Sequence, residues 1–120
     1  MTAHLYAFYG SLRRGLHNYE RFELHLRYHF SCWIKGYQLY SFGEFPFAVK
    51  TNNDKDQILI EIFEINDVEI QKQIDELELG YGYFMEAIMI DKQSVKIYLL
   101  EKNTNYPLVI GGDWVKFFRG

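Results

Sequence analysis

The sequence of 120 residues has little cysteine: Cys32 is the only one. An intramolecular disulfide framework is therefore excluded, and this cysteine content is typical of a protein in a reducing cytoplasm. Proline is also scarce, with two residues, and no internal repeat or low-complexity segment is visible. We therefore expect one domain over residues 1–120, which is long enough to bury about two-thirds of its unfolded surface.

The sequence also has fewer positively charged than negatively charged residues. The 13 Lys and Arg residues stand against 16 Asp and Glu residues, and no basic block interleaves with aromatic residues. Nucleic-acid binding normally needs a basic face, so no nucleic-acid partner is expected. The apolar runs fall far short of the ~20 residues that cross a bilayer, and the first residues lack the pattern of a signal peptide. The sequence therefore predicts a soluble, cytoplasmic protein with no membrane partner.

Aromatic residues, by contrast, are abundant. Ten Tyr, ten Phe and two Trp occur in this short chain. Tyrosine carries a polar group that a sealed core rarely needs, so this composition predicts an aromatic-lined cavity in addition to the core. The alternative is that tyrosines cover strand edges, which we expect of about half of them.

The pattern of apolar residues predicts about six strands and two modest helices. The first helix is expected to be capped by Asn18 and to end near Phe30, and the second to begin at a capping pair of Asn66 and Glu69. The predicted strands are residues 4–9, 33–40 with an interruption at Gly36, a short strand ending at Thr51, 57–65, 84–90 and 95–101. This order predicts an α+β domain with a mixed, barrel-like sheet.

The first candidate site is the loop that follows the first strand. The apolar run 5–9 stops abruptly at Gly10-Ser11, and Arg13, Arg14 and another glycine follow. A small-residue turn after a strand leaves backbone N–H groups unpaired and favours an anion, either a phosphate or a carboxylate. The glycine patterns of a P-loop and of a dinucleotide fold are both missing. The alternative is an ordinary connection to a helix, with a solvated arginine pair.

Glu78 is the second candidate. If Ile74 and Leu77 face inward, Glu78 lies beside the apolar stripe at the end of the helix, just before the aromatic run 80–84. A carboxylate among aromatic rings is partly desolvated, which raises its pKa towards that of a useful general base. The alternative is a solvated acidic helix face.

Other reactive residues lack the partners that their chemistry requires. His25 and His29 have the spacing of metal ligands on a helix, but Leu26 stands where a zinc protease has glutamate, so we expect a surface-helix role. Cys32 is expected to be a buried structural cysteine. Ser11 lacks the motif of a hydrolase nucleophile. The sequence therefore predicts neither a metal nor a cofactor.

Together, five segments resemble a known family. Residues 9–15, with Asn18, resemble the opening motif of the gamma-glutamylcyclotransferase and gamma-glutamylamine cyclotransferase family. Four further segments follow in the family's order and cover nearly the whole chain. They are residues 36–40 leading to Phe45-Pro46, residues 74–78, Tyr98, and residues 112–114.

The resemblance implies a small mixed β-barrel of about six strands flanked by short helices. It also implies a cofactor-independent reaction on a small γ-glutamyl substrate, whose α-amine attacks its own γ-carbonyl to form 5-oxoproline and release an amine or amino acid. Glu78 would be the catalytic acid/base, and the backbone amides of the loop would hold the substrate's α-carboxylate. The implied substrate-binding residues are Tyr9, Gly10, Ser11, Leu12, Tyr81, Tyr83 and Tyr98.

The proton chemistry agrees with this implied role. An α-ammonium, with a pKa of ~7.7–8, must lose a proton before it attacks, whereas an ordinary glutamate at ~4.3 is a poor acceptor. The difference of roughly 3–4 units predicts that Glu78 needs a desolvated, aromatic setting.

At two positions the sequence departs from the family's pattern. Leu79 stands where the family commonly has glycine, and Met85 stands where it tends to have arginine. A non-catalytic small-molecule or partner-binding module with the same fold is therefore an alternative function. An amide hydrolase is a second alternative, for which no separate nucleophile or metal set is visible. The oligomeric state and the leaving group stay open.

Overall fold

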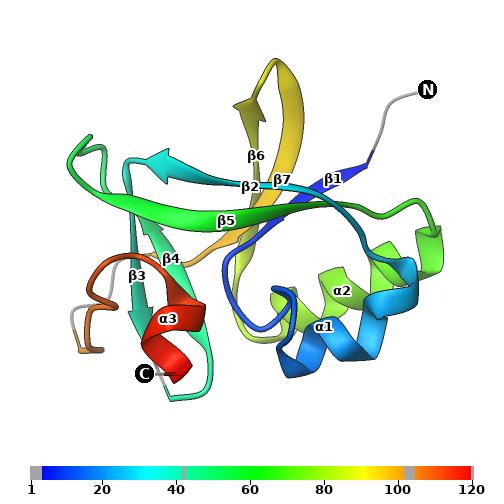
Figure 1. Ribbon diagram of the computed structural model, residues 1–120, viewed down its shortest axis with the longest axis horizontal. Coiled ribbons are helices and arrows are strands. Elements are labelled where there is room, and N and C mark those ends of the chain that lie inside the picture. The colour runs from blue at the N-terminus through cyan, green and yellow to red at the C-terminus, as the bar shows by residue number, and fades with distance from the viewer. Residues whose placement is uncertain (1–3, 42, 102–104, 120) are drawn as a thin grey trace.

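The computed structural model describes residues 4–41, 43–101 and 105–119. Strands and short helices are mixed along this part of the chain, which confirms the α+β class (Figure 1). The strands are β1 (Leu5–Phe8), β2 (Arg27–Lys35), β3 (Tyr37–Ser41), β4 (Pro46–Lys50), β5 (Gln57–Glu64), β6 (Phe84–Ile90) and β7 (Gln93–Leu99). The helices are α1 (His17–Phe22), α2 (Val68–Gly80) and α3 (Trp114–Arg119), with a 3-10 turn η1 (Glu23–His25). Residue 42, within the predicted turn before β4, lies outside the described residues.

The strands form two sheets. The larger has the order β2-β5-β1-β7-β6, in which β1 pairs antiparallel with β5 and parallel with β7; the smaller is the antiparallel pair of β3 and β4. The sheets are not closed into a barrel, so the expected barrel-like closure is not observed (Figure 1). Gly36 explains much of this, because its φ of 88° turns the chain out of the large sheet between β2 and β3. The single interrupted strand predicted over 33–40 is therefore two strands in two sheets.

The first helix is much shorter than predicted. It begins at His17, ends at Phe22, and is followed by η1 and then by β2 from Arg27. Residues 27–35 pair with β5 along their length, and alternate side chains, including Phe30, lie against the core. The helical pattern predicted to Phe30 is therefore wrong, because pairing with a distant strand overrides the local apolar spacing.

The second helix is present as predicted, but its cap is one residue later. Asp67, and not Asn66, is the N-cap, and its carboxylate accepts hydrogen bonds from the amides of Glu69 (2.9 Å) and Ile70 (3.2 Å). The side chain of Asn66 instead donates to Glu64. A side-chain oxygen at the N-cap satisfies amides that the helix itself leaves unpaired.

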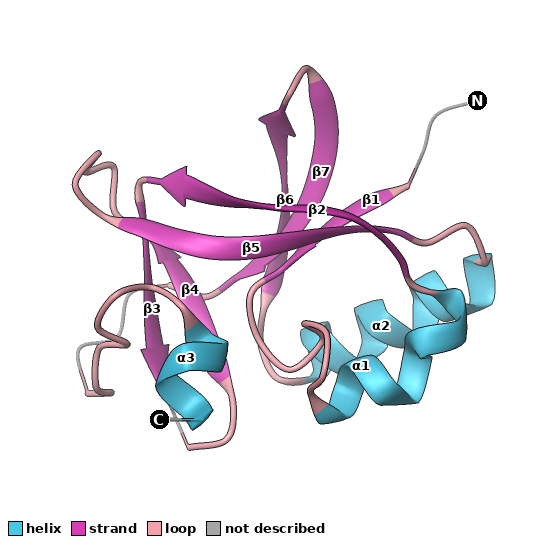
Figure 2. Ribbon diagram, viewed as in Figure 1, coloured by secondary structure: helices cyan, strands magenta, loops and turns pink. Residues whose placement is uncertain are grey.

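Apolar side chains cover both faces of the large sheet. On β1, Leu5 and Ala7 belong to one buried cluster, whereas Tyr6 and Phe8 belong to the other, as the alternation of a strand requires. The second cluster also takes in Ile74 of α2, which is fully buried. Figure 2 shows α1 and α2 at one end of the molecule and α3 at the other, near β3 and β4. No helix in the described parts of the chain is long and apolar enough to cross a membrane.

Candidate active site

Three consecutive backbone amides are unpaired where β1 ends. The amides of Gly10, Ser11 and Leu12 donate no hydrogen bond to any other described residue, whereas the next two amides are occupied. Arg13 N donates to Gly10 O and Arg14 N donates to Glu61, both over 2.9 Å. Such a run of amides without partners among the described residues presents partial positive charge to the space in front of it.

The loop is anchored from behind by a buried ion-pair cluster. The guanidinium of Arg13, which is 6% exposed, bonds to Glu61 of β5 (3.0 Å) and to Asp113 just before α3 (2.8 Å). Arg14 bonds to the other oxygen of Glu61 (3.2 Å), and its guanidinium lies over the ring of Tyr28. The solvated arginine pair, which we held as the alternative, is therefore wrong for Arg13. Its role in the structure is to fix the loop.

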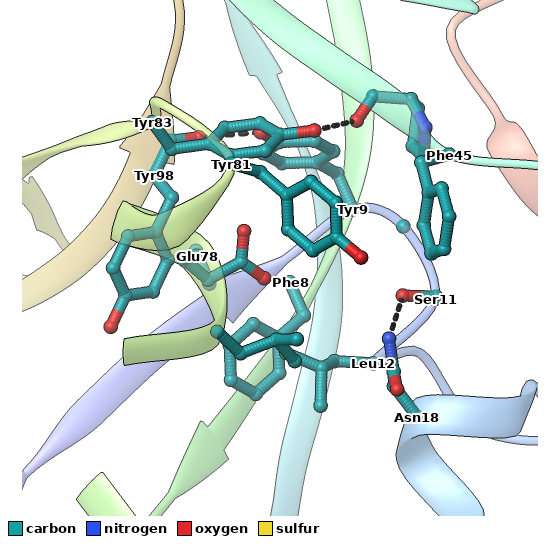
Figure 3. A pocket seen from close by; sticks show the side chains of 14 residues that line it. Phe8, Tyr9, Ser11, Leu12, Asn18, Phe45, Glu78, Tyr81, Tyr83 and Tyr98 are labelled. Carbon is teal, nitrogen blue, oxygen red and sulfur yellow. Dashed lines mark hydrogen bonds between the residues drawn. The ribbon is translucent and has the colours of Figure 1, made fainter. Parts of the chain in front are cut away.

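A pocket opens in front of this loop. The loop, both α1 and α2, and the strands β4 and β7 contribute to its wall (Figure 3). The structure brings all eight predicted site residues together here. The lining residues are Ala7, Phe8, Tyr9, Gly10, Ser11, Leu12, Asn18, Phe45, Pro46, Leu77, Glu78, Tyr81, Tyr83 and Tyr98.

Glu78 carries the charge of this pocket. It lies in the last turn of α2, is partly buried, and points towards the centre of the pocket (Figure 3). Its carboxylate makes no hydrogen bond or ion pair with any residue that the structure describes. Burial alone raises the pKa of Glu78 to about 7. The group is therefore poised to accept a proton and to return it near neutral pH.

Three of the four pocket tyrosines use their hydroxyl groups for structure. Tyr9 donates to the backbone oxygen of Tyr98 (2.5 Å), Tyr83 donates to Pro46 O (2.6 Å), and the hydroxyl of Tyr98 donates to Asp75. Burial also raises the pKa values of the Tyr9, Tyr83 and Tyr98 hydroxyls, so all three stay neutral. They present their rings to the pocket and leave Glu78 in an apolar setting.

Ser11 and Asn18 meet at the far side of the loop. Asn18 is buried within α1 and does not cap it, because the N-cap is Leu16. Its side-chain amide donates to the Ser11 hydroxyl over 2.7 Å (Figure 3). The predicted helix cap is thus wrong, and Asn18 orients the serine side chain of the loop.

Phe45 is the clearest lining residue that the sequence reasoning missed as a site residue. Its ring packs against that of Tyr81, with centroids 5.8 Å apart. The signal for it was its place in the Phe45-Pro46 segment that resembles the family, and no local pattern relates it to Tyr81, which is far along the chain.

The two departures from the family pattern lie away from the pocket wall. Leu79 is 52% exposed and Met85 is 45% exposed. Neither is among the described residues that line the pocket.

The two histidines considered as metal ligands are not on one helix. His25 lies in η1 with Asp67 at 3.9 Å, and His29 lies in β2 and bonds to Glu64 over 3.0 Å. Across residues 4–41, 43–101 and 105–119, no three His, Cys, Asp or Glu side chains are grouped as metal ligands. Cys32 is partly buried on β2, and burial raises the pKa of its thiol.

The fold and the pocket define a small α+β protein built around one desolvated carboxylate that lies in the same pocket as a loop of free amides. The family model described as "Gamma-glutamyl cyclotransferase, AIG2-like" matches residues 6–116. The chain belongs to this family, and the resemblance noted from its motifs is confirmed.

Solved structures of similar proteins extend this result. An uncharacterized protein, PH0828, from Pyrococcus horikoshii has 26% sequence identity and a TM-score of 0.80, over 97% of this chain and 93% of that one. Protein ytfP from Escherichia coli has 27% identity and a TM-score of 0.73, over 92% and 96%. An AIG2-like protein from Mus musculus has 19% identity and a TM-score of 0.66, over 83% and 78%, which shows a shared fold. No curated protein matches the sequence.

Proposed function

We propose that this protein is a cyclotransferase that converts a γ-glutamyl amine or γ-glutamyl amino acid to 5-oxoproline, with Glu78 as the general acid/base. Family membership supports the class of reaction. The observation that carries the residue assignment is the carboxylate of Glu78, which is desolvated, unpaired within the described residues and turned into the pocket.

The loop would bind the glutamyl part of the substrate. The free amides of Gly10, Ser11 and Leu12 suit a carboxylate, which can accept several hydrogen bonds at once. The rings of Tyr9 and Tyr83 would enclose the apolar methylene groups of the substrate. A substrate held in a curled conformation by these contacts reacts within itself, so proximity supplies much of the acceleration.

Glu78 would carry the proton between the two nitrogen atoms. With its pKa at about 7, it lies about one unit below an α-ammonium of ~7.7–8, instead of roughly 3–4 units. It accepts the ammonium proton, the freed amine attacks the γ-carbonyl carbon, and the new C–N bond closes the ring. As the bond to the leaving nitrogen breaks, Glu78 returns the proton to that nitrogen. The ring nitrogen then gives its second proton to Glu78, which passes it to the released amine, so the products are the neutral lactam and an ammonium, and Glu78 is again a carboxylate. The reaction consumes no water.

The direct test is an assay for 5-oxoproline with a panel of γ-glutamyl amines and dipeptides. We expect product from at least one of them, and a loss of about 10²–10⁴-fold in rate for Glu78→Gln, since this change removes the proton acceptor. Glu76→Gln, an exposed carboxylate on the same helix, is the matched control and should retain the activity.

Other outcomes would contradict the proposal. Saturable binding of a γ-glutamyl compound with no product from any member of the panel would favour the non-catalytic binding module. Release of free glutamate in place of 5-oxoproline would indicate hydrolysis. Full activity in Glu78→Gln would assign the proton transfer to another group.

A further inference from the structure

The mouth of the pocket is formed by aromatic rings from distant segments. Tyr81, which is 58% exposed, follows α2, and its ring lies against that of Phe45, the residue before β4 (Figure 3). The ring of His17, at the start of α1, meets the edge of Phe45 with centroids 5.6 Å apart. Tyr81 is exposed and Phe45 is partly buried, so these two lining residues stand between the inner pocket and solvent.

No lysine or arginine lies among the described residues that line this pocket. Arg13 is buried behind the loop and is held by Glu61 and Asp113, while Arg14 bonds to Glu61 and covers the ring of Tyr28. The loop amides suit a carboxylate, and the glutamyl α-carboxylate would use them. A second carboxylate, on the leaving group, would find no lysine or arginine among the described residues that line the pocket.

A second depression shares Tyr81 with the pocket. Its described lining has one charged side chain, and that side chain is acidic. The lining residues are Phe47, Tyr81, Gly82, Phe84, Leu100, Glu101 and Tyr106. Glu101 disfavours an anion there.

We propose that the Phe45–Tyr81 pair is a leaving-group subsite, and that the enzyme prefers γ-glutamyl amides of uncharged aromatic amines to γ-glutamyl amino acids. This inference rests on the proposed cyclotransferase function. A flat ring on the leaving amine can pack against Phe45 and Tyr81 in the offset or edge-to-face geometry that aromatic rings prefer. A carboxylate on the same amine would be desolvated without a partner.

Three matched substrates test the subsite. The γ-glutamyl amide of phenethylamine carries the ring, γ-glutamylphenylalanine carries the same ring and a carboxylate, and the γ-glutamyl amide of ethylamine lacks the ring. We expect kcat/KM for the phenethylamide to exceed that for the ethylamide by about 10–100-fold, and that for γ-glutamylphenylalanine by about 10-fold or more. The product measured is 5-oxoproline in every case.

The outcomes separate the two proposals. Equal kcat/KM for the phenethylamide and the ethylamide, or a preference for γ-glutamylphenylalanine, overturns the subsite and leaves the cyclotransferase function standing. If none of the three substrates gives 5-oxoproline although the wider panel does, the subsite alone is overturned. If no γ-glutamyl compound gives product, both proposals fail together.

Variants of Phe45 supply a second measurement. Phe45→Ala should reduce the preference for the phenethylamide over the ethylamide by about 10-fold, whereas Phe117→Ala, an exposed ring on α3, should leave this ratio unchanged. Phe45→Lys adds a cation at the mouth and should raise kcat/KM for γ-glutamylphenylalanine relative to the phenethylamide by about 10-fold. Unchanged ratios in both Phe45 variants would overturn the subsite.

Discussion

At the scale of single residues, Glu78 shows how its surroundings change the chemistry of an ordinary side chain. Burial among aromatic rings raises the pKa of its carboxyl to about 7. The deprotonated form is the base, so kcat/KM should rise with pH through an acid limb at about 7. It should fall again above ~7.7–8 as the substrate loses its own ammonium proton.

The pH profile is measured with one good substrate across pH 5.5–9, at constant ionic strength, on the wild type and on Glu78→Gln. The acid limb should disappear from the residual activity of the variant, since glutamine does not titrate. A kcat/KM of the wild type that stays flat down to pH 5.5, as for a solvated glutamate, would contradict the desolvated setting.

Gly10 is required by a close contact. A Cβ atom built on Gly10 would lie 2.7 Å from Cγ and 2.9 Å from Cδ of Pro46, the first residue of β4. Gly10→Ala should therefore lower the free energy of unfolding by about 1–3 kcal/mol, because overpacking forces the loop and the strand apart. Gly80→Ala is the control, since nothing lies within 4 Å of its Cβ position. Chemical denaturation gives the free energy of unfolding of both variants. Equal values for Gly10→Ala and Gly80→Ala would contradict the close contact of Gly10 with Pro46.

At the scale of elements, the start of α2 depends on one side chain. Asp67 accepts hydrogen bonds from two amides of the first turn, whereas Asn66 bonds back to Glu64. Asp67→Ala should cost about 1 kcal/mol of unfolding free energy, and Asn66→Ala should change it much less. Urea titration of both variants measures their free energies of unfolding. A larger loss of stability from Asn66→Ala than from Asp67→Ala would support Asn66 as the cap, as predicted from the sequence.

At the scale of the whole molecule, the Arg13 cluster joins the loop after β1 to the middle of β5 and to the chain before α3. Glu61→Gln places a neutral amide beside the buried Arg13 guanidinium and leaves Asp113 as its charged partner among the described residues. We expect it to lower the free energy of unfolding by about 1–3 kcal/mol, less than the ~3–5 kcal/mol of breaking a buried pair outright, because Asp113 still compensates the charge.

The control for this change is Glu86→Gln, which removes an exposed ion pair with Lys50 and should have little effect on stability. Thermal and urea unfolding of both variants give the comparison. If Glu61→Gln were as stable as the wild type, the cluster would not be what holds the loop in place.

The fold was predictable where a local pattern matched the final contacts. The strands at 57–65 and 84–90 and the helix around Ile74 were predicted nearly as they are, because apolar periodicity and burial agree there. The segment from Phe22 to Phe30 was not, since its spacing suits a helix but β5 offers a whole strand of backbone partners. The interruption at Gly36 could be recognised from the sequence. The direction in which the chain leaves the large sheet at Gly36 could not be predicted from it.

By itself, the sequence predicted the family and eight of the residues that line the pocket around Glu78, because these lie in short ordered motifs. Only the tertiary structure decided that Arg13 is buried, since its partners Glu61 and Asp113 lie 48 and 100 positions along the chain. It alone brought Phe45 against Tyr81 at the mouth and left the sheets open instead of closed. The same physical reason applies to all of these. Burial and strand pairing depend on which distant segments meet in space, and a local sequence pattern does not specify those segments.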